Sequence, residues 1–374
     1  MSLSVLLVTA TAKAGGSERA MAGLARSLVD MGHAPSAVLL EPGPMEGWLQ
    51  DASCPATVIP SGQFRDLART RATVRRLRAL VRERRPDVVL SNLTKGHVYG
   101  GTAARGLAPA AWWQLATATW SRFDVLAAAV PAAAVVCASD AILEGQRRIS
   151  RGRAVTIYPG IRVAEIAARA GEGAKIRADL GWEGHPIVGI PGRLQPWKGQ
   201  EVFLRAAALV AARRPDVRFL VVGGAILGTE GDYPARLAAS ARALGLAGAV
   251  HFAGHQADAY AWMDAMDVVV HASWGEPFGL VLVEAMALGK PLVAADSAGP
   301  QEIVEHGRSG LLVPPGQPAA LAAALLRVLD DRPFADRLGA GGLERVRRFS
   351  DDASARQFVD LFEDLRRRRR GGGG

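Results

Sequence analysis

Two glutamates separated by seven residues, Glu276 and Glu284, flank the start of an apolar helix. A Pro-Phe-Gly turn between them breaks the preceding strand, so Glu276 lies on a loop and Glu284 about one turn inside the helix. The backbone N–H groups of Phe278, Gly279 and Leu280 point out of this helix end, which attracts anions. The carboxylate of Glu284 has apolar neighbours and is costly there unless a ligand with paired hydroxyls, such as a ribose, hydrogen-bonds it. The alternative is an ordinary αβ unit with two surface glutamates.

Two cations follow a buried strand upstream of these glutamates. The apolar run 187–190 is typical of a parallel strand buried on both faces, and the loop after it carries Arg193 and Lys198 between glycines. Ligands of open α/β sheets bind at the carboxyl ends of such strands. Arg193 can grip a diphosphate as a fork and Lys198 as a point charge. The alternative is that Arg193 and Lys198 are ordinary solvated cations of a loop. The flanking glycines and the downstream glutamates disfavour it.

A glycine pair opens the first helix of the chain. The strand 3–8 and the loop 9–14 lead to Gly15 and Gly16, and Ser17 is expected to cap the helix. Glycines at such a turn let a phosphate or a sugar approach the backbone closely. Tight packing of the helix on the strand is the other explanation.

Together, these segments resemble the family 4 retaining glycosyltransferases, which have the GT-B fold. The resemblance rests on the Glu-x7-Glu signature with its turn, the Gly-Arg-x4-Lys-Gly segment and the Gly-Gly-x-Glu-Arg loop at 15–19. The spacing of two glutamates is weak by itself. The match becomes specific because it extends through 289–296, 299–304 and 310–316.

The resemblance implies a role for each of the residues in the second half of the chain. Glu276 would hold hydroxyls of the donor sugar, the amides of 278–280 the sugar and phosphate, and Glu284 the nucleotide ribose. Arg193 and Lys198 would neutralise the leaving diphosphate.

Strands and helices alternate along the whole chain, which predicts an α/β fold with two doubly wound parallel sheets. The expected strands are 3–8, 37–40, 57–59, 87–90, 111–115, 133–137 and 155–158 in the first sheet, and 187–190, 217–222, 249–252, 267–271, 292–294 and 310–313 in the second. The resemblance implies two Rossmann-like domains facing a central cleft, with the Gly15–Gly16 loop closing over the donor.

The domain boundaries follow from the same pattern. Residues 1–165 are expected to form the acceptor-side domain, and 166–348 the nucleotide-sugar-binding domain, with a connecting helix over 164–179. A helix over 349–365 would cross back to the first domain, and 366–374 is expected to be a disordered Arg/Gly tail.

One position departs from the family pattern. Many relatives have a His after a Trp-Gln pair near the reacting sugar, whereas this chain has Leu115, which can neither hydrogen-bond nor transfer a proton. His97, which follows the strand 87–90 at its ligand end, is a candidate acceptor-side substitute, and a helix-surface residue is the alternative. Leu115 puts catalysis in doubt but not donor binding.

The net charge of +9 is concentrated in one helix. The segment 65–85 contains nine arginines, together with an apolar stripe at helical spacing. A basic amphipathic helix can lie on an anionic membrane, although most such helices pack on a sheet and are otherwise solvated. No aromatic interleaving or nucleic-acid motif accompanies the basic segments, so we expect no nucleic-acid partner.

Length and composition agree with this organisation. The 374 residues, 49% of them hydrophobic, suffice for two cores, and the absence of an apolar run of 18 residues predicts no transmembrane helix. The first residues lack the basic region of a signal peptide. Cys54 and Cys137 have neither metal nor redox spacing and suit a reducing cytoplasm, so we expect a cytoplasmic protein that can touch the inner face of the membrane.

The sequence therefore predicts a retaining glycosyltransferase that moves a sugar from a nucleoside-diphosphate sugar to a hydroxyl acceptor. No Asp-x-Asp pair is present, and Arg193, Lys198 and the helix end at 278–280 can neutralise the diphosphate, so we expect neither metal nor cofactor. The resemblance implies front-face transfer, in which the departing phosphate deprotonates the acceptor. The nucleotide base is expected near Gly254 and His255. A non-catalytic sugar-nucleotide-binding protein and a sugar phosphorylase are the alternatives.

Overall fold

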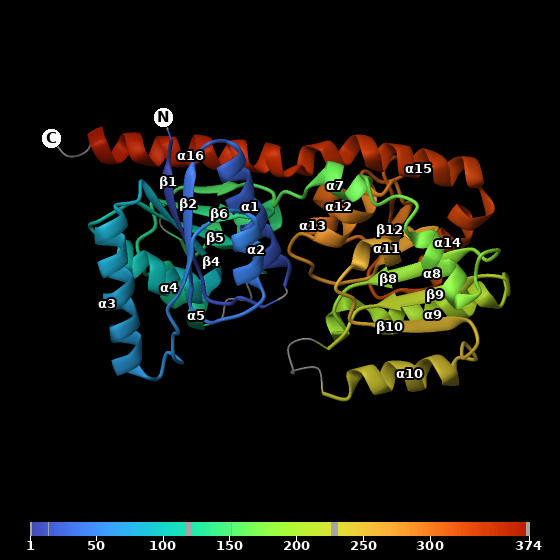
Figure 1. Cartoon of the computed structure of the whole chain (residues 1–374). Helices are drawn as coiled ribbons and strands as arrows, with labels where there is room; N and C mark the ends of the chain where they lie inside the picture. Colours follow the sequence, from blue (N-terminus) through green and yellow to red (C-terminus); the bar gives the residue numbers. More distant parts are fainter. Residues whose placement is uncertain (1, 14, 117–121, 151, 226–230, 372–374) are drawn as a thin grey trace. The chain divides into compact units, whose positions relative to one another are not determined.

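The computed structural model of the chain describes residues 2–13, 15–116, 122–150, 152–225 and 231–371. It divides into two compact units (Figure 1). Unit 1 contains Met1–Ile161 and Phe349–Gly374, and unit 2 contains Arg162–Arg348. The chain thus passes from one unit to the other four residues before the expected boundary at 165.

Unit 1 is built on a parallel sheet with the strand order β3-β2-β1-β4-β5-β6-β7. The strands are β1 (Ser4–Thr9), β2 (Ala34–Leu39), β3 (Ala56–Val58), β4 (Val88–Asn92), β5 (Ala110–Gln114), β6 (Ala134–Cys137) and β7 (Ala154–Thr156). All seven were predicted, and the largest shift is the start of β2 at Ala34 instead of Ala37. Such strands are found easily because burial on both faces makes them continuous apolar runs.

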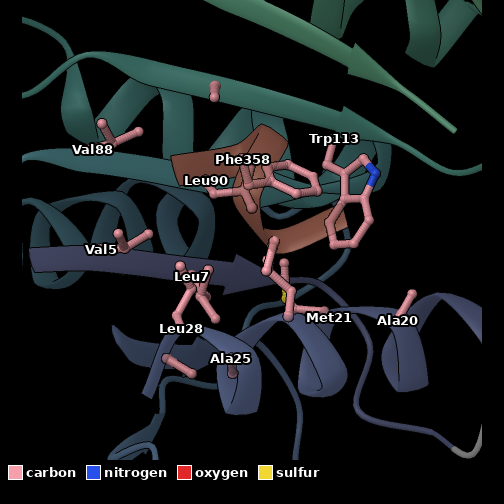
Figure 2. Close-up of a cluster of buried hydrophobic side chains, with 14 of the residues drawn as sticks. Val5, Leu7, Ala20, Met21, Ala25, Leu28, Val88, Leu90, Trp113 and Phe358 are labelled. Carbon is pink, nitrogen blue, oxygen red and sulfur yellow. The ribbon is translucent and has the colours of Figure 1, made fainter. Parts of the chain in front are cut away.

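Helices cover this sheet and complete its core. They are α1 (Gly16–Asp30), α2 (Met45–Asp51), α3 (Leu67–Arg84), α4 (Leu93–Ala104), α5 (Arg122–Ala128), α6 (Asp140–Arg147) and α16 (Asp351–Gly371). Met21 and Leu28 of α1 point at Leu7 of β1, and Phe358 of α16 meets Trp113 of β5 edge-on, with ring centroids 4.8 Å apart (Figure 2). The apolar residues that recur at helical spacing therefore form the buried face of α1.

The last helix, α16, belongs to unit 1. The N–H of Asp351 donates to the carbonyl of Ile161 at 2.8 Å, and the Ser354 hydroxyl donates to the carbonyl of Tyr158 at 2.7 Å. The helix continues to Gly371, so 366–371 are helical and not a disordered tail. Its end is held by ion pairs, among them Arg153 with Asp364. The expected tail residues 372–374 lie outside the described residues.

Unit 2 is a second parallel sheet, with the strand order β10-β9-β8-β11-β12-β13. The strands are β8 (Ile187–Pro191), β9 (Arg218–Val222), β10 (Val250–Gly254), β11 (Val268–His271), β12 (Leu292–Ala295) and β13 (Leu311–Val313). The helices are α7 (Val163–Ala167), α8 (Gly173–Leu180), α9 (Gln200–Ala211), α10 (Tyr233–Ala243), α11 (Ala259–Asp264), α12 (Leu280–Ala287), α13 (Gly299–Ile303), α14 (Pro318–Asp330) and α15 (Arg332–Arg345). The strand order reverses between β8 and β11, which is where ligands of open α/β sheets bind.

The expected connecting helix over 164–179 is two helices, α7 and α8. The Asp264 carboxylate explains the break, because it accepts hydrogen bonds from the N–H groups of Gly171 and Gly173 at 2.8 and 2.9 Å. These backbone groups bind a buried side chain from α11, and Lys290 pairs with the same carboxylate at 2.9 Å.

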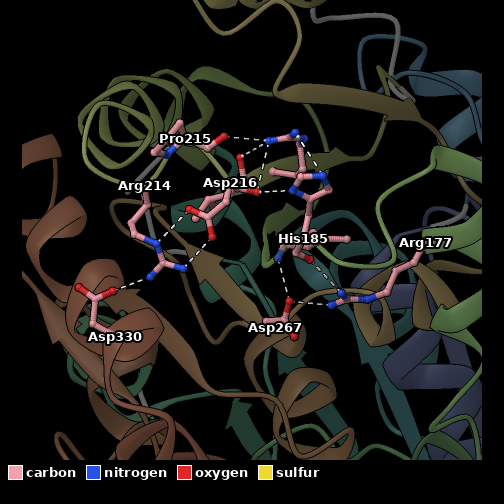
Figure 3. Close-up of polar contacts among 10 residues, drawn as sticks. Arg177, His185, Arg214, Pro215, Asp216, Asp267 and Asp330 are labelled. Carbon is pink, nitrogen blue, oxygen red and sulfur yellow. Dashed lines mark hydrogen bonds and ion pairs between the residues drawn. The ribbon is translucent and has the colours of Figure 1, made fainter.

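A polar network closes the amino-end edge of the second sheet (Figure 3). Asp267 lies just ahead of β11. Its carboxylate accepts from the guanidinium of Arg177 and from the N–H of Ile187, the first residue of β8, both at 2.7 Å. Arg214 bridges Asp216 and Asp330 at 2.8 and 2.5 Å. These contacts pair the polar groups at the amino ends of the strands. The predicted site residues lie at the carboxyl ends, on the opposite edge of the sheet.

Candidate functional site

The loop after β8 packs against the end of β11. Gly199 has a φ of +76°, and a Cβ there would lie 2.2 Å from the carbonyl oxygen of Ala272, so only glycine fits. The N–H of Trp274 donates to the carbonyl of Trp197 at 3.1 Å. These contacts bring the two predicted motifs together across the switch point of the sheet.

Lys198 and Glu276 form the centre of this site. The Lys198 Nζ lies 2.6 Å from Glu276 Oε2, and the side chains are only 18% and 10% exposed. Burial alone would raise the pKa of Glu276, but the charge of Lys198 and a hydrogen bond from His271 hold that pKa well below its ordinary value. Glu276 is therefore an anion fixed by a cation, and the pair is much less screened by solvent than a surface ion pair.

His271 is a site residue that the sequence analysis missed. It ends β11, is buried, and places its Nε2 3.1 Å from Glu276 Oε2 and 3.3 Å from the Ser273 hydroxyl. A histidine at the carboxyl end of an otherwise all-valine strand, five residues before Glu276, is the signal that could have found it.

Backbone contacts hold the turn between Glu276 and α12. The N–H of Gly299 donates to the carbonyl of Glu276 at 3.0 Å, and a Cβ on Gly299 would lie 2.4 Å from the carbonyl oxygen of Phe278. Phe278 is buried, Gly279 caps the helix with a φ of +108°, and Leu280 is its first residue. The helix start therefore has a fixed position beside the Lys198–Glu276 pair.

Glu284 lies on α12 and is half-buried. The hydroxyl of Tyr260 from α11 donates to its Oε1 at 3.3 Å. No direct contact between Glu284 and the Lys198–Glu276 pair is seen among the described residues. Its half-exposed carboxylate next to a tyrosine hydroxyl can accept hydrogen bonds from a diol.

The remaining predicted residues of unit 2 lie at the same sheet edge. The carbonyl of Arg193 accepts from Gln200 Nε2 at 2.8 Å, while its guanidinium is half-exposed. Gly254 ends β10, and its carbonyl accepts from the N–H of Gly223 at 2.9 Å; His255 follows it and is exposed. Arg193 thus shares a loop with Lys198, and Gly254 and His255 lie two strands away from them.

Gly15 and Gly16 belong to unit 1. Gly15 is the N-cap of α1 and Gly16 its first residue, so Ser17 does not cap the helix as predicted. The Ser17 hydroxyl instead donates to Glu18 Oε2 at 2.7 Å, and Thr11 donates to Oε1 of the same buried carboxylate. The glycines thus lie over a hydrogen-bonded carboxylate at the carboxyl end of β1.

The structure corrects the expectation for His97. This residue is fully buried on α4, stacks on Trp112 with ring centroids 4.9 Å apart, and places its Nε2 3.2 Å from the carbonyl of Val130. Burial lowers its pKa to about 4. His97 is therefore a core residue, neither exposed on a helix surface nor available to an acceptor. Leu115 packs against the main core of unit 1.

The two cysteines are also core residues. Burial raises the pKa of both Cys54 and Cys137 to about 12, so both thiols stay protonated. In the described part of the chain, no helix is long and apolar enough to cross a membrane.

The fold and the site define an α/β protein of two parallel-sheet units, with a buried ion pair at the switch point of the second. The sequence model of "Glycosyl transferases group 1" matches residues 173–345, and that of "Glycosyltransferase Family 4" matches residues 14–165. The chain belongs to the family 4 glycosyltransferases and has their GT-B fold.

Named relatives and solved structures agree with this assignment. A D-inositol 3-phosphate glycosyltransferase of a Nocardioides species is 37% identical over 225 residues, which are 57% of this chain and 49% of the relative. The chain spans about half the length of the curated relatives it matches. Anabaena HepE, solved with UDP and glucose, has a TM-score of 0.86 and 28% identity over 96% of this chain and 99% of its own. The HepE complex with UDP-glucose has the same TM-score, at 27% identity over 97% of this chain and 100% of its own.

Proposed function

We propose that the protein is a retaining glycosyltransferase that moves a sugar from a nucleoside-diphosphate sugar to a hydroxyl acceptor without a metal ion. The buried Lys198–Glu276 pair at the switch point, beside the start of α12, carries the proposal. A buried anion held by a cation can orient hydroxyls, and an adjacent helix N-terminus attracts phosphate.

The proposed donor is a UDP sugar, with UDP-glucose as the first candidate. Anabaena HepE, whose structure matches this chain over nearly its whole length, has been solved with UDP-glucose. In our proposal Glu284 holds the ribose, Gly254 and His255 lie near the base, and the Gly15–Gly16 loop contacts the donor from unit 1.

The diphosphate is proposed to rest on Arg193, Lys198 and the start of α12. In this proposal Lys198 contacts both the Glu276 carboxylate, on the sugar side of the bond that breaks, and the diphosphate on its other side. It therefore neutralises negative charge on both. Fixed donors of this kind stabilise a leaving group because they need no reorganisation during the reaction. This arrangement supplies the positive charge that a bound metal supplies elsewhere.

The proposed reaction needs no protein nucleophile. The acceptor hydroxyl attacks the anomeric carbon on the face that the diphosphate leaves, and the bond from that carbon to the phosphate oxygen breaks. The acceptor proton passes to the departing phosphate, so the products are the glycoside and the nucleoside diphosphate. This route tolerates Leu115, because no side chain at that position has to carry a proton.

A transfer assay separates this proposal from its two alternatives. We would incubate the protein with UDP-glucose and a panel of hydroxyl acceptors and measure glycoside formation. Glu276→Gln should lower turnover by about 10²-fold, since one preorganised polar contact has that effect. A sugar-nucleotide-binding protein without catalysis would bind UDP-glucose and form no product with any acceptor, whereas a phosphorylase would require inorganic phosphate. In the binding protein, Leu115→His could create activity that the wild type lacks.

We further propose a peripheral contact with an anionic membrane through unit 1. Arg65, just before α3, and the α3 arginines at 69, 71, 75, 76 and 82 are exposed, and none of them forms an ion pair among the described residues. On α5, Phe123, Val125 and Leu126 are each at least 50% exposed, and Phe123 stacks on Phe64, just before α3, at 5.9 Å. An exposed apolar cluster beside unpaired arginines is typical of a surface that binds anionic lipid.

A further inference from the structure

We propose that His271 is a positioning residue that holds the Glu276 carboxylate in the orientation that receives the donor sugar. The inference rests on the proposed function, because it assigns His271 a part in donor recognition. His271 does not have to touch the sugar. It acts through Glu276, which it contacts at 3.1 Å from the last position of β11.

Two donors bind the same oxygen of the Glu276 carboxylate. Lys198 Nζ and His271 Nε2 both reach Glu276 Oε2, at 2.6 and 3.1 Å. No hydrogen bond from the described part of the chain reaches Oε1. These two donors, one on the loop after β8 and one at the end of β11, prevent rotation of the carboxylate, so Oε1 keeps one direction and its lone pairs are left for a ligand hydroxyl.

In the hydrogen bond between His271 and Glu276, the imidazole is the donor. The Nδ1 of His271 is buried and has no hydrogen-bond partner, so a proton there would be a buried donor without an acceptor, which is unfavourable. A proton on Nε2 has the ionised Glu276 as its acceptor. Ser273, at 3.3 Å, is the second neighbour of the same nitrogen.

Besides Lys198 and Glu276, His271 borders a small hollow whose lining residues, all of them described and uncharged, include Val202, Ala295 and Gln317. A residue that only had to fill this space could be apolar. The imidazole supplies one N–H directed at Glu276, and this property distinguishes positioning from packing.

The experiment compares the binding of UDP and UDP-glucose by calorimetry in the full chain. The measured quantity is the sugar gain, defined as the Kd for UDP divided by the Kd for UDP-glucose. His271→Phe keeps the ring volume and removes the donor, so it should lower the sugar gain by about 3- to 10-fold, the effect of one lost hydrogen bond. Affinity for UDP alone should stay within about 2-fold of the wild-type value, which is less than the effect of one lost hydrogen bond.

Rescue and pH dependence separate positioning from packing. His271→Gln or His271→Asn, which carry an amide N–H, should recover part of the gain that His271→Phe loses. Because His271 helps to lower the pKa of Glu276, the sugar gain of His271→Phe should begin to fall at a higher pH on acidification than that of the wild type. His251→Phe is the matched control, since this half-buried histidine of β10 stacks on Trp262 and does not contact Glu276.

Each result has a defined consequence. An unchanged sugar gain in His271→Phe, an equal loss for UDP and UDP-glucose, or a failure of both amide variants to recover any gain overturns the inference. A wild-type protein that binds UDP-glucose no more tightly than UDP overturns both this inference and the proposed role of Glu276. A wild-type protein that shows the sugar gain but forms no glycoside overturns only the transferase proposal, and the His271 comparison keeps its meaning.

Discussion

At the scale of single residues, the site depends on which charges are paired inside the protein. Glu276 is buried and fully compensated by Lys198 and His271, whereas Arg193 and Glu284 are half-exposed. A buried compensated ion orients a ligand with little rearrangement, and half-exposed ions can turn toward the ligand when it arrives. These different environments predict different consequences for substitution.

Glu284→Ala is expected to weaken nucleotide binding while leaving the fold intact. The variant removes a half-buried carboxylate of α12 whose contacts include the Tyr260 hydroxyl. The lost charged hydrogen bond should weaken UDP binding by roughly 1.5–3 kcal/mol, measured by calorimetry. Glu183→Ala, which removes an exposed glutamate of the same unit, is the control. Unchanged affinity for UDP would refute the ribose role.

His97 should reduce the stability of the protein in mild acid. Its pKa in the folded protein, about 4, is below the ordinary value of 6.5, so between these values the unfolded chain binds a proton that the folded protein does not. Its contribution therefore lowers the free energy of unfolding as the pH falls from about 6.5 to about 4. His97→Phe keeps the stack on Trp112 and should make the fall shallower in denaturant titrations.

The exposed His255 supplies the control for that measurement. His255→Phe should leave the pH dependence of stability as it is in the wild type. A slope for His97→Phe identical to that of the wild type would show that His97 already takes up a proton in the folded protein.

At the scale of elements, the sequence identified the strands far better than the details of the site. Most of the strands, such as β1 and β4, are buried on both faces, so their apolar runs are visible in the sequence without any tertiary information. The end of α16 and the break between α7 and α8 were missed, because ion pairs such as Arg153 with Asp364 and the hydrogen bonds to Asp264 come from distant segments.

The site shows the same division. Lys198 and Glu276 were both found from their motifs, but their direct contact across 78 positions of sequence could not be. His271 was missed because its place at the end of an all-valine strand indicates a site residue only once its contact with Glu276 is known. His97 was misjudged because its stacking on Trp112 and its bond to Val130 depend on how α4 packs on the sheet.

The basic helix α3 gives a prediction at the same scale. Vesicles that contain phosphatidylglycerol should sediment the protein, and vesicles of phosphatidylcholine alone should not, because each arginine near an anionic surface contributes about 1 kcal/mol. The double variant Arg75→Glu with Arg76→Glu should reduce vesicle binding and the salt dependence of that binding. The double variant Phe123→Ser with Leu126→Ser should reduce vesicle binding even at low salt.

Arg332→Glu with Arg337→Glu, on α15 of unit 2, matches the charge change and serves as the control. Equal loss in the control pair would mean that the total charge of +9, and not α3, attracts the protein to the membrane. Binding to phosphatidylcholine vesicles as strong as to anionic ones would contradict the role of the arginines.

At the scale of the whole molecule, the two edges of the second sheet have different tasks. The amino-end edge is closed by ion pairs such as Arg177 with Asp267 (Figure 3). The carboxyl-end edge holds the Lys198–Glu276 pair and the start of α12. Each partly exposed pair at the amino end is worth little alone, about 0–1 kcal/mol, so its substitution should not alter ligand binding. The chemistry of the chain should therefore follow from the carboxyl-end edge.

If the proposed function is right, this chain should transfer glucose from UDP-glucose with retention of the anomeric configuration and without added metal. Retention is expected because the acceptor attacks from the face that the diphosphate leaves, and the site offers Arg193 and Lys198 where other enzymes use a metal ion. Proton NMR of the first glycoside formed should show an α product from the α-linked donor, and EDTA should leave the rate unchanged. Leu115→His should change that rate only modestly, because the leaving phosphate takes the proton. A β-linked first product would contradict front-face transfer, and loss of activity in EDTA that Mg²⁺ restores would show that the two cations are insufficient to hold the diphosphate.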